Sequence, residues 1–448
     1  MKGLMMRRVC SLLLVVLLLN SCNNSTEEPT LIDNELVSLL ETNAPAGEGL
    51  SFYQFPESDD YQNIPNDPNN PITQAKVDLG RMLFHETGIA IDPKDPNNTG
   101  TYSCASCHHA QAGFQAGVAQ GIGEGGEGFG VAGELRVKQA ATPEDSIDVQ
   151  PVRTPSALNI AYQTNVLWNG QFGATGVNVG TEINWLQGTP TDKNNLGFEG
   201  TETQAIAGLD VHRQRIDGSL CETNAEYVAA FAAAFPDLPE NERINNITGG
   251  LAIAAYERTL LANRSPWQEW LAGDTDALTP NQKEGAMLFF GEAGCVACHT
   301  GPALNTMTFH ALGFNDLQGF QFKENDMANR GRGIFIKDSD EFFKFKVPQL
   351  YNLKDSPFYG HGASFTSVKD VIEYKNAAVL ENAAVPEFLL AAEFKPLDLN
   401  AEEIEALVDF IENGLYDPAL ERYVPQSIPS GNCFPNNDEP SKVDLGCI

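Results

Sequence analysis

The sequence predicts a mainly α-helical protein made of two domains of similar design that pack around a shared interface. Three observations lead to this fold class. A five-residue motif occurs twice, at 104–108 and 295–299. A stretch with the pattern of a helix precedes each copy, at 73–84 and 279–290. Segments with the alternating pattern of β-strands are few. A repeated unit of helix, loop and motif therefore predicts two related domains.

The repeated motif is Cys-x-x-Cys-His, the spacing at which a c-type haem is attached. In such a site two thiols bond covalently to the porphyrin vinyl groups, and the histidine ligates the iron. A structural zinc site would pair its cysteines inside one small module, and a redox dithiol would not carry a histidine after both copies. We therefore expect two covalently bound c-type haems in two cytochrome c-like domains, with the haems facing the shared interface. The residues are Cys104, Cys107 and His108 in the first copy and Cys295, Cys298 and His299 in the second.

The first residues have the pattern of an export signal. Basic residues at 2, 7 and 8 precede an apolar run at 12–19, and Cys22 follows a small residue. This pattern predicts a lipoprotein signal peptide at 1–21, a lipid anchor on Cys22 and a polar tether at 22–50. The protein is then exported, as a periplasmic or outer-membrane lipoprotein. Export agrees with the haem motifs, because c-type haem is attached outside the bacterial cytoplasmic membrane.

Composition limits the partners and the architecture. The formal charge of −32 argues against nucleic acid, whose phosphates would be repelled, and favours small substrates or a partner with a basic contact patch. No second apolar run reaches the length of a membrane span, so we expect a soluble protein. Its predicted parts are an N-terminal haem domain at 51–265, a C-terminal haem domain at 266–424 and a tail at 425–448.

Three cysteines remain apart from the signal segment, the expected lipid site Cys22 and the motifs. An oxidising compartment permits a disulfide between Cys433 and Cys447, which would close a short loop in the tail, although Cys221 is an equal candidate partner.

Helix signals recur along the chain. Thr73 and Thr279 are predicted N-caps, the second followed by a proline and by Gln282 of a capping box. An insertion rich in proline and asparagine is expected to form a surface loop, and one segment is expected to link the domains. The predicted loop is 92–100, and the predicted linker is 265–276. Further helices are predicted at 247–261, 368–378 and 401–413, and Gly414 ends the last of them.

Several blocks outside the motifs match one known family. From about residue 75 to residue 416, the chain resembles the bacterial di-haem cytochrome c peroxidases and their relative MauG, which oxidises tryptophans in a precursor protein. The blocks are Leu79-Gly80-Arg81, Arg153-Thr154-Pro155-Ser156-Ala157-Leu158-Asn159, Leu167-Trp168-Asn169-Gly170, Phe309-His310-Ala311-Leu312-Gly313 and Lys346-Val347-Pro348-Gln349-Leu350.

The resemblance implies that the first haem is peroxidatic. Members that rest in a blocked state place a loop histidine on its iron, about 16 residues after the proximal histidine; here that position is Glu124, a poor haem ligand, in the glycine-rich segment 121–126. The alternative is a flexible loop with a solvated glutamate, and both interpretations leave this iron without a histidine from the loop. We therefore expect the fully oxidised protein to react with peroxide without prior reduction, as MauG does.

The family also has a distal acid–base residue near an E-Q-A-like run. Here Gln204 belongs to that run and His212 lies near the position of the acid–base residue, so His212 is expected to move the proton of hydrogen peroxide. The alternative is a surface or core histidine bonded to Glu202 or Arg213. Trp168 matches the tryptophan between the two haems and is expected to relay electrons, where packing is the alternative.

At the second haem the family uses a methionine or tyrosine of a late helix as the sixth ligand. Alignment puts Lys375 there; a solvated lysine, Tyr374 and Met307 remain alternatives. Histidines 310 and 361 are expected to have supporting roles near this haem. The family also binds calcium between the haems, partly on an asparagine. Here Arg153 stands at that position, so calcium is doubtful unless Asp355 compensates.

Together these features predict a di-haem peroxidase. It would reduce hydrogen peroxide to water with electrons from a small cytochrome or cupredoxin, through the second haem and Trp168. Two alternatives remain: a MauG-like oxidase of a protein or organic substrate, and a non-catalytic di-haem electron-transfer lipoprotein.

Overall fold

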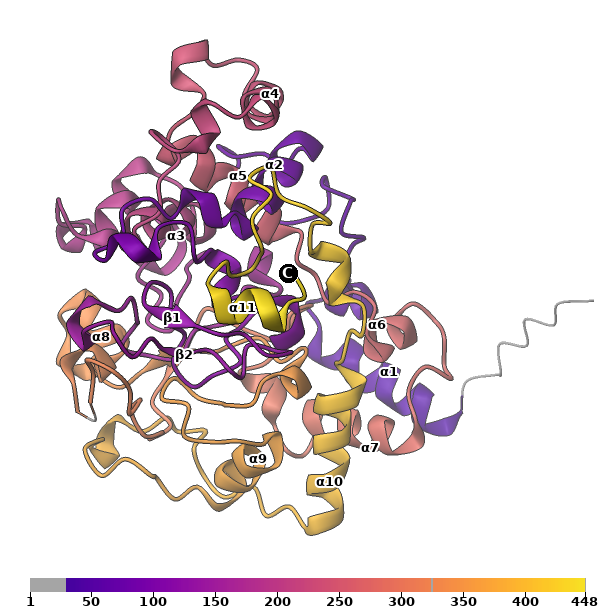
Figure 1. Ribbon diagram of the computed structural model, residues 1–448. Coiled ribbons are helices and arrows are strands. Elements are labelled where there is room, and N and C mark those ends of the chain that lie inside the picture. Colours follow the sequence, from indigo (N-terminus) through magenta and orange to yellow (C-terminus); the bar gives the residue numbers. More distant parts are fainter. Residues whose placement is uncertain (1–29, 324, 448) are drawn as a thin grey trace, which may run out of the picture.

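The computed structural model describes residues 30–323 and 325–447, so the predicted signal peptide and Cys22 lie outside the described residues. Within them the fold is mainly α-helical with two very short antiparallel strand pairs, as predicted (Figure 1). The elements are α1 (Leu31–Asn43), α2 (Gln74–His85), α3 (Gly200–Val211), α4 (Ala225–Ala234), α5 (Asn246–Arg258), α6 (Pro266–Leu271), α7 (Pro280–Phe290), α8 (Arg332–Ile336), α9 (Val368–Ala377), α10 (Ala401–Asp409) and α11 (Glu439–Asp444), with β1 (Gly126–Glu127), β2 (Val137–Lys138), β3 (Phe309–His310) and β4 (Phe345–Lys346).

The predicted helix starts are confirmed. The Thr73 side chain accepts a hydrogen bond from the backbone N–H of Lys76 at the start of α2. Thr279 and Gln282 form the predicted capping box at the start of α7, with Pro280 in the first turn. Both helices therefore begin where the sequence places the caps.

Each domain is built on a close helix crossing of the same kind. A Cβ atom on Gly80 of α2 would lie 1.9 Å from the carbonyl oxygen of Ala252 in α5. A Cβ atom on Gly285 of α7 would lie 2.0 Å from the carbonyl oxygen of Ala406 in α10. Only glycine lets two helix backbones approach so closely, so the internal repeat predicted from the sequence is also a repeat of packing.

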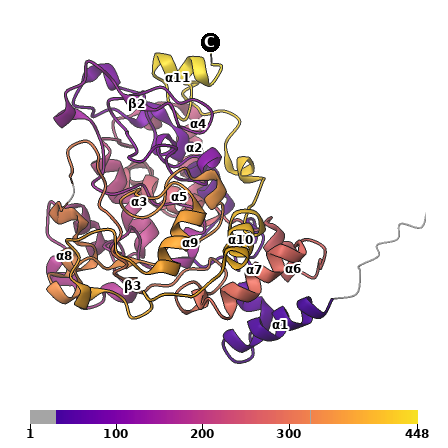
Figure 2. The ribbon, with the colours of Figure 1, turned by 90° about the horizontal axis from the view of Figure 1, so that it is seen from below.

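The predicted tether is wrong over residues 31–43, which form α1. Leu36 and Leu40 lie one turn apart on this helix and are fully buried, while Asp33 accepts a hydrogen bond from Trp270 Nε1 and pairs with Lys283 Nζ, both at 2.8 Å. An apolar stripe with a buried ion pair holds α1 against the second domain. Figure 2 shows α1 beside α6 and α7, at the end of the molecule opposite α11.

The predicted linker at 265–276 also contains a packed helix. Ser265 caps α6, and its Trp267 and Trp270 are buried and stacked on each other, with ring centroids 5.4 Å apart. Trp267 also stacks on Phe290 of α7 at 5.5 Å. The segment is therefore packed in the core beside α7. A solvated linker would leave the large apolar surface of the two tryptophans exposed to water.

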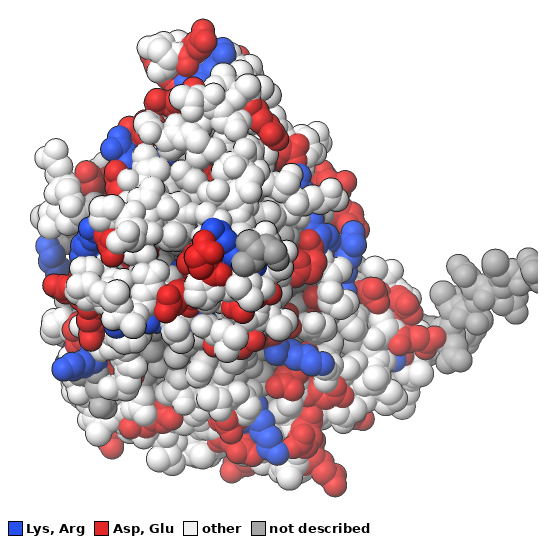
Figure 3. All heavy atoms as spheres, in the orientation of Figure 1, with Lys and Arg blue, Asp and Glu red and all other residues white. Residues whose placement is uncertain are grey.

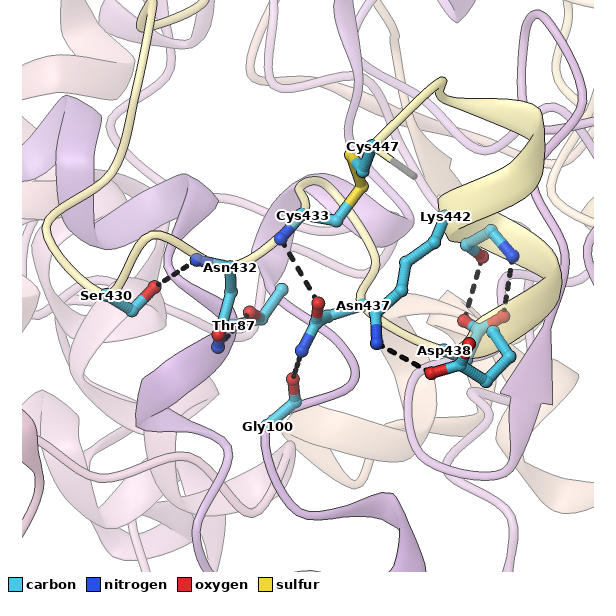
Figure 4. Close-up of a disulfide and its surroundings, with 11 residues drawn as sticks. Thr87, Gly100, Ser430, Asn432, Cys433, Asn437, Asp438, Lys442 and Cys447 are labelled. Atoms are coloured by element: carbon cyan, nitrogen blue, oxygen red, sulfur yellow. Dashed lines mark hydrogen bonds and ion pairs between the residues drawn. A yellow bond between two sulfur atoms is a disulfide. The ribbon is translucent and has the colours of Figure 1, made fainter.

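The C-terminal tail closes over the first motif. Cys433 and Cys447 form the predicted disulfide, while Cys221 is buried and unpaired. Asn437 bridges the backbone N–H of Cys433 and the carbonyl of Gly100 (Figure 4). Ser103, directly before the first motif, donates to the carbonyl of Pro435 at 2.8 Å. The disulfide loop thus fastens the tail to the segment that leads into the first motif.

None of the helices in the described part of the chain combines the length and apolar character needed to span a bilayer.

Candidate functional site

A cavity of about 320 Å³ joins the two motifs. His108 of the first motif and His299 of the second both line it, and Trp168 lies in its wall. The strand pair β3–β4 sets Phe309 opposite Lys346 and so brings two of the family-like blocks together at this wall. The expected interface between two haem sites is therefore a continuous cavity.

Both motif histidines have the geometry of iron ligands. Nδ1–H of His108 donates to the carbonyl of Phe114 at 3.2 Å, and Nδ1–H of His299 donates to the carbonyl of Leu304 at 2.9 Å. Because a carbonyl only accepts, Nε2 is left with the lone pair that binds a metal. Burial lowers the pKa of His108 to about 4 and that of His299 to about 3, so both rings are neutral. All four motif cysteines are unpaired, and this donor set fits two c-type haems.

His212 follows the last turn of α3 and is held by a buried carboxylate. Its Nδ1 lies 2.8 Å from Oδ2 of Asp148, and its side chain is 36% exposed while that of Asp148 is 5% exposed. Burial is the largest effect and lowers the pKa of this imidazole, but the charge and the hydrogen bond of Asp148 together outweigh it and the net pKa is raised. The positive charge of His212 in turn lowers the pKa of His108, which indicates that the two rings are near each other. The alternative in which His212 bonds Glu202 or Arg213 is wrong, because Glu202 pairs with Arg258 and Arg213 pairs with Glu124.

Gln204 and His212 lie on one face of α3. Gln204 lines the cavity, whereas His212 lies two turns further along the same face. A Cβ atom on Gly208, between them, would lie 3.4 Å from Gln204 Nε2 and 3.9 Å from His212 Cδ2. Gly208 therefore leaves room between the two side chains, although the imidazole itself is not part of the cavity lining.

Glu124 is buried and ion-paired, so the interpretation as a solvated glutamate on a flexible loop is wrong. Its Oε2 pairs with Nη1 of Arg213, and its Oε1 accepts a hydrogen bond from the backbone N–H of Asp95 at 2.8 Å. The side chain is fully buried and does not line the cavity. With both oxygens engaged, Glu124 has no oxygen left for an iron at the first motif.

The glycines of 121–126 serve close packing. A Cβ atom on Gly121 would lie 2.8 Å from Sγ of Cys107, and one on Gly123 would lie 2.4 Å from Oδ2 of Asp148. The buried Arg136 donates from Nε to the carbonyl of Ile122 at 2.6 Å and from Nη2 to that of Gly123 at 2.8 Å. The segment is therefore fixed against the first motif.

Trp168 is anchored between the motifs. Its Nε1–H donates to the carbonyl of Arg153 at 2.8 Å, and its ring meets His361 edge to face at 6.5 Å. His361 is buried and stacks on Phe345 at 3.7 Å. An aromatic series thus runs through the cavity wall between the two sites.

Arg153 occupies the position suggested for calcium. The guanidinium is buried and donates to the carbonyls of Val118 at 2.8 Å and Ala116 at 3.1 Å, and to Oγ of Ser356 at 2.9 Å. Carbonyl and hydroxyl oxygens of this kind are what calcium would bind, and here they accept from a fixed cation. Asp355 instead accepts a hydrogen bond from Asn352.

Lys375 of α9 lies in the second half of the cavity, beside the second motif. Burial lowers the pKa of its amine, and no hydrogen bond or ion pair engages that amine among residues 30–323 and 325–447. Tyr374 donates to the carbonyl of Leu312 at 2.5 Å and does not line the cavity, and neither does Met307. His310 and Glu393 both line the cavity at the second site, and Nδ1 of His310 lies 3.6 Å from the carboxylate of Glu393.

Several acidic residues of the site were missed from the sequence, among them Asp148 and Glu257; Asp316 and Glu393 line the cavity. Asp148 lies 64 residues before its partner His212, and no local pattern links the two. Glu257 also lines the cavity; its signal was an acidic residue inside the apolar helix pattern 247–261. Only the packing of α3, α5 and the segment 147–149 brings the carboxyls of Asp148 and Glu257 to the site.

Comparisons with known proteins agree with this geometry. Residues 74–276 match the family described as di-haem cytochrome c peroxidase. The chain is 26% identical over 362 residues to the methylamine utilization protein MauG of Methylorubrum extorquens, covering 80% of this chain and 83% of that protein. It is also 26% identical over 373 residues to the cytochrome-c peroxidase IdrP1 of Pseudomonas sp. strain SCT, covering 78% and 83%. A solved MauG-like protein associated with microbial copper homeostasis shares the fold, with a TM-score of 0.57, 24% identity and coverage of 82% of this chain and 96% of that one.

The fold, the two motifs and these relatives indicate an oxidoreductase that resembles the di-haem peroxidases, a family that implies two c-type haems. The comparisons confirm the resemblance to the di-haem cytochrome c peroxidase and MauG family.

Proposed function

We propose that this chain is an exported di-haem peroxidase that reduces hydrogen peroxide to water with electrons from a small redox protein. One observation carries the proposal: a single cavity is lined by both motif histidines, which are half-buried and neutral, and by Trp168, while Glu124, at the position of the family's blocking histidine, is ion-paired with Arg213. Covalent attachment would use the four motif cysteines.

At the first site, Cys104, Cys107 and His108 would hold a c-type haem, which would supply the redox centre for peroxide. His212 supplies the proton transfer. Because Asp148 holds Nδ1–H, the imidazole presents Nε2, which takes a proton from one peroxide oxygen and returns it to the other. The carboxylate keeps the ring in one tautomer and stabilises its charged form. The Gln204 amide, in the cavity wall, orients the substrate.

At the second site we propose Lys375 as the sixth ligand. The Lys375 amine has no hydrogen-bond partner among the described residues and lies half-buried near Cys295 and Cys298. Removal from water lowers its pKa, so it is less costly to keep neutral than a solvated lysine, and a neutral amine can ligate a metal. In Lys375→Ala the second haem should lose the lysine ligand, so its spectrum should change from that of a six-coordinate iron to that of a more weakly ligated iron. Tyr374→Phe is the matched control, and an unchanged spectrum in Lys375→Ala would exclude the lysine.

The net charge of the protein suggests the kind of electron donor, and the sequence suggests a lipid anchor. Acidic side chains outnumber basic ones on the face seen in Figure 3, in line with the formal charge of −32. A small cytochrome or cupredoxin with a basic contact patch fits this surface, with association that weakens as salt increases. Lipid attachment at Cys22 would hold the enzyme at a membrane surface.

The test mixes the fully oxidised holoprotein with one equivalent of hydrogen peroxide in a stopped-flow spectrometer. We expect a rapid change of the first-haem spectrum without added electrons, and oxidation of two equivalents of a reduced small cytochrome per peroxide. A reaction that begins only after one electron is added would mean that a gating ligand exists. No reaction in either state would favour an electron carrier, and reaction without cytochrome turnover would favour a MauG-like oxidase.

A further inference from the structure

Glu257 is a buried carboxyl that the mechanism above does not use. It lies in the last turn of α5, is 6% exposed and lines the cavity. Its Oε2 is buried without a hydrogen-bond partner, and its carboxyl has no ion pair within the described residues. A buried carboxylate in this state would be costly, so the geometry favours the neutral acid.

The groups around Glu257 also favour the neutral acid. Glu202 of α3 adds a second negative charge, and Cys104 is the neighbour from the first motif. Arg258, the next residue of α5, has its guanidinium bound to Glu202 at 2.6 Å and Glu199 at 3.0 Å, so its charge is already compensated. Burial, followed by the charge of Glu202, raises the pKa of Glu257 to about 8. At neutral pH the side chain carries a proton that it can give up.

Peroxide reduction needs such a proton. Hydrogen peroxide, two electrons and two protons give two waters. His212 takes a proton from the substrate and returns it, so it adds no net proton to the products. The two protons must therefore enter the cavity from other groups or from water.

We propose that Glu257 is a proton donor of the first-motif half of the cavity and delivers one of these two protons. The inference rests on the proposed function. In the step, the O–H bond of the Glu257 carboxyl breaks and an O–H bond of product water forms, while the electrons come from the redox partner. The carboxylate then regains a proton from water entering the cavity, and the cost of a buried charge favours this return.

The test uses the holoprotein and three variants. Glu257→Gln keeps size and polarity but has no acidic proton, Glu257→Asp keeps the proton on a shorter side chain, and Glu412→Gln changes a half-buried carboxyl outside the cavity. Infrared difference spectra at pH 7 should show the carbonyl stretch of a protonated carboxylic acid in the wild type and in Glu412→Gln, and its loss in Glu257→Gln. The band should bleach during turnover and then recover.

Rates provide the second readout. With reduced donor in excess, the wild-type rate should fall as pH rises through about 8, because the acid loses its proton. Glu257→Gln should be slower by about 10²-fold or more and lack this alkaline limb, with partial rescue by Glu257→Asp. Peroxide binding in the oxidised protein should be unchanged in both variants.

A wild type without the carboxylic acid band, or a Glu257→Gln variant with the wild-type rate and alkaline limb, would overturn the proposal and leave the proposed function standing. A wild type that shows the band but reduces no peroxide would instead refute the proposed function, and the proposal with it.

Discussion

Changing Asp148 to Asn tests the proton-transfer role of His212 without removing the imidazole. The variant keeps an oxygen that can accept the Nδ1–H bond, now 2.8 Å long, but removes the negative charge. Because the charge and the hydrogen bond of Asp148 together raise the pKa of His212 against burial, the pKa should fall when the charge is removed. Arg213, also near this ring, acts in the same direction as burial.

The expected shift follows from the strength of this bond. Hydrogen bonds to charged groups contribute about 1.5–3 kcal/mol, and the lower end applies because the His212 side chain is 36% exposed. About 1.5 kcal/mol corresponds to roughly one pKa unit. Since the neutral ring accepts the proton, the peroxide rate rises with pH through the pKa of His212. In Asp148→Asn this rising limb should move about one unit to lower pH, and the plateau should be lower because the base is weaker.

The assay follows the first-haem spectrum after mixing oxidised holoprotein with peroxide from pH 5 to 9. His212→Ala should lose the rising limb and be about 10²–10⁴-fold slower. Asp145→Asn is the matched control, because this exposed carboxylate lies three residues away and does not bond His212. A limb at the wild-type pH in Asp148→Asn, or a wild-type rate in His212→Ala, would refute the assignment.

Three further predictions follow. Changing Cys104 and Cys107 together to Ala should remove both covalent bonds at the first motif, so that acid–acetone extraction removes this haem and leaves the other; two retained haems would contradict the motif assignment. Treatment with a calcium chelator should leave spectra and peroxide rates unchanged, because Arg153 already occupies the oxygens suited to that cation; activity lost with chelator and restored by calcium would contradict this. Although burial opposes its ionisation, hydrogen bonds led by that of Lys283 lower the pKa of Asp33 to about 2. This lowered pKa stabilises the fold above pH 3.8, and the stabilisation disappears as pH falls toward 2. In urea unfolding, Asp33→Asn should therefore cost about 2 kcal/mol at pH 7 and little at pH 2, and an equal cost at both pH values would contradict the linkage.

Local signals predicted the elements of this fold. The caps Thr73 and Thr279 are determined by a few adjacent residues, and so were found in the sequence. The disulfide of the tail joins cysteines only 14 residues apart, so loop closure favoured it. By contrast, α1 depends on the pairing of Asp33 with Trp270 and Lys283, more than 230 residues away. Its polar flanks therefore suggested a tether.

The same limit explains the acidic groups of the site. The resemblance to the family placed Gln204 and His212 together, and the structure puts them along one helix. Asp148 and Glu257 come from other segments, and their chemical state is determined by burial and by the charges nearby. A pattern in the sequence can show that a residue is acidic, but whether it orients an imidazole or holds a proton depends on tertiary packing.

The glycine-rich segment 121–126 shows why composition alone misled. Glycines usually indicate freedom, yet here a side chain at Gly121 would collide with Cys107 and one at Gly123 with Asp148. The same packing brings Glu124 to Arg213, the residue that follows His212, so the loop and the end of α3 are fixed together. Opening the first site by moving this loop would break a buried ion pair and leave a charge without a partner, which costs about 3–5 kcal/mol. A loop held in this way is suited to a site that is ready in the oxidised state, and poorly suited to one that must be released by reduction.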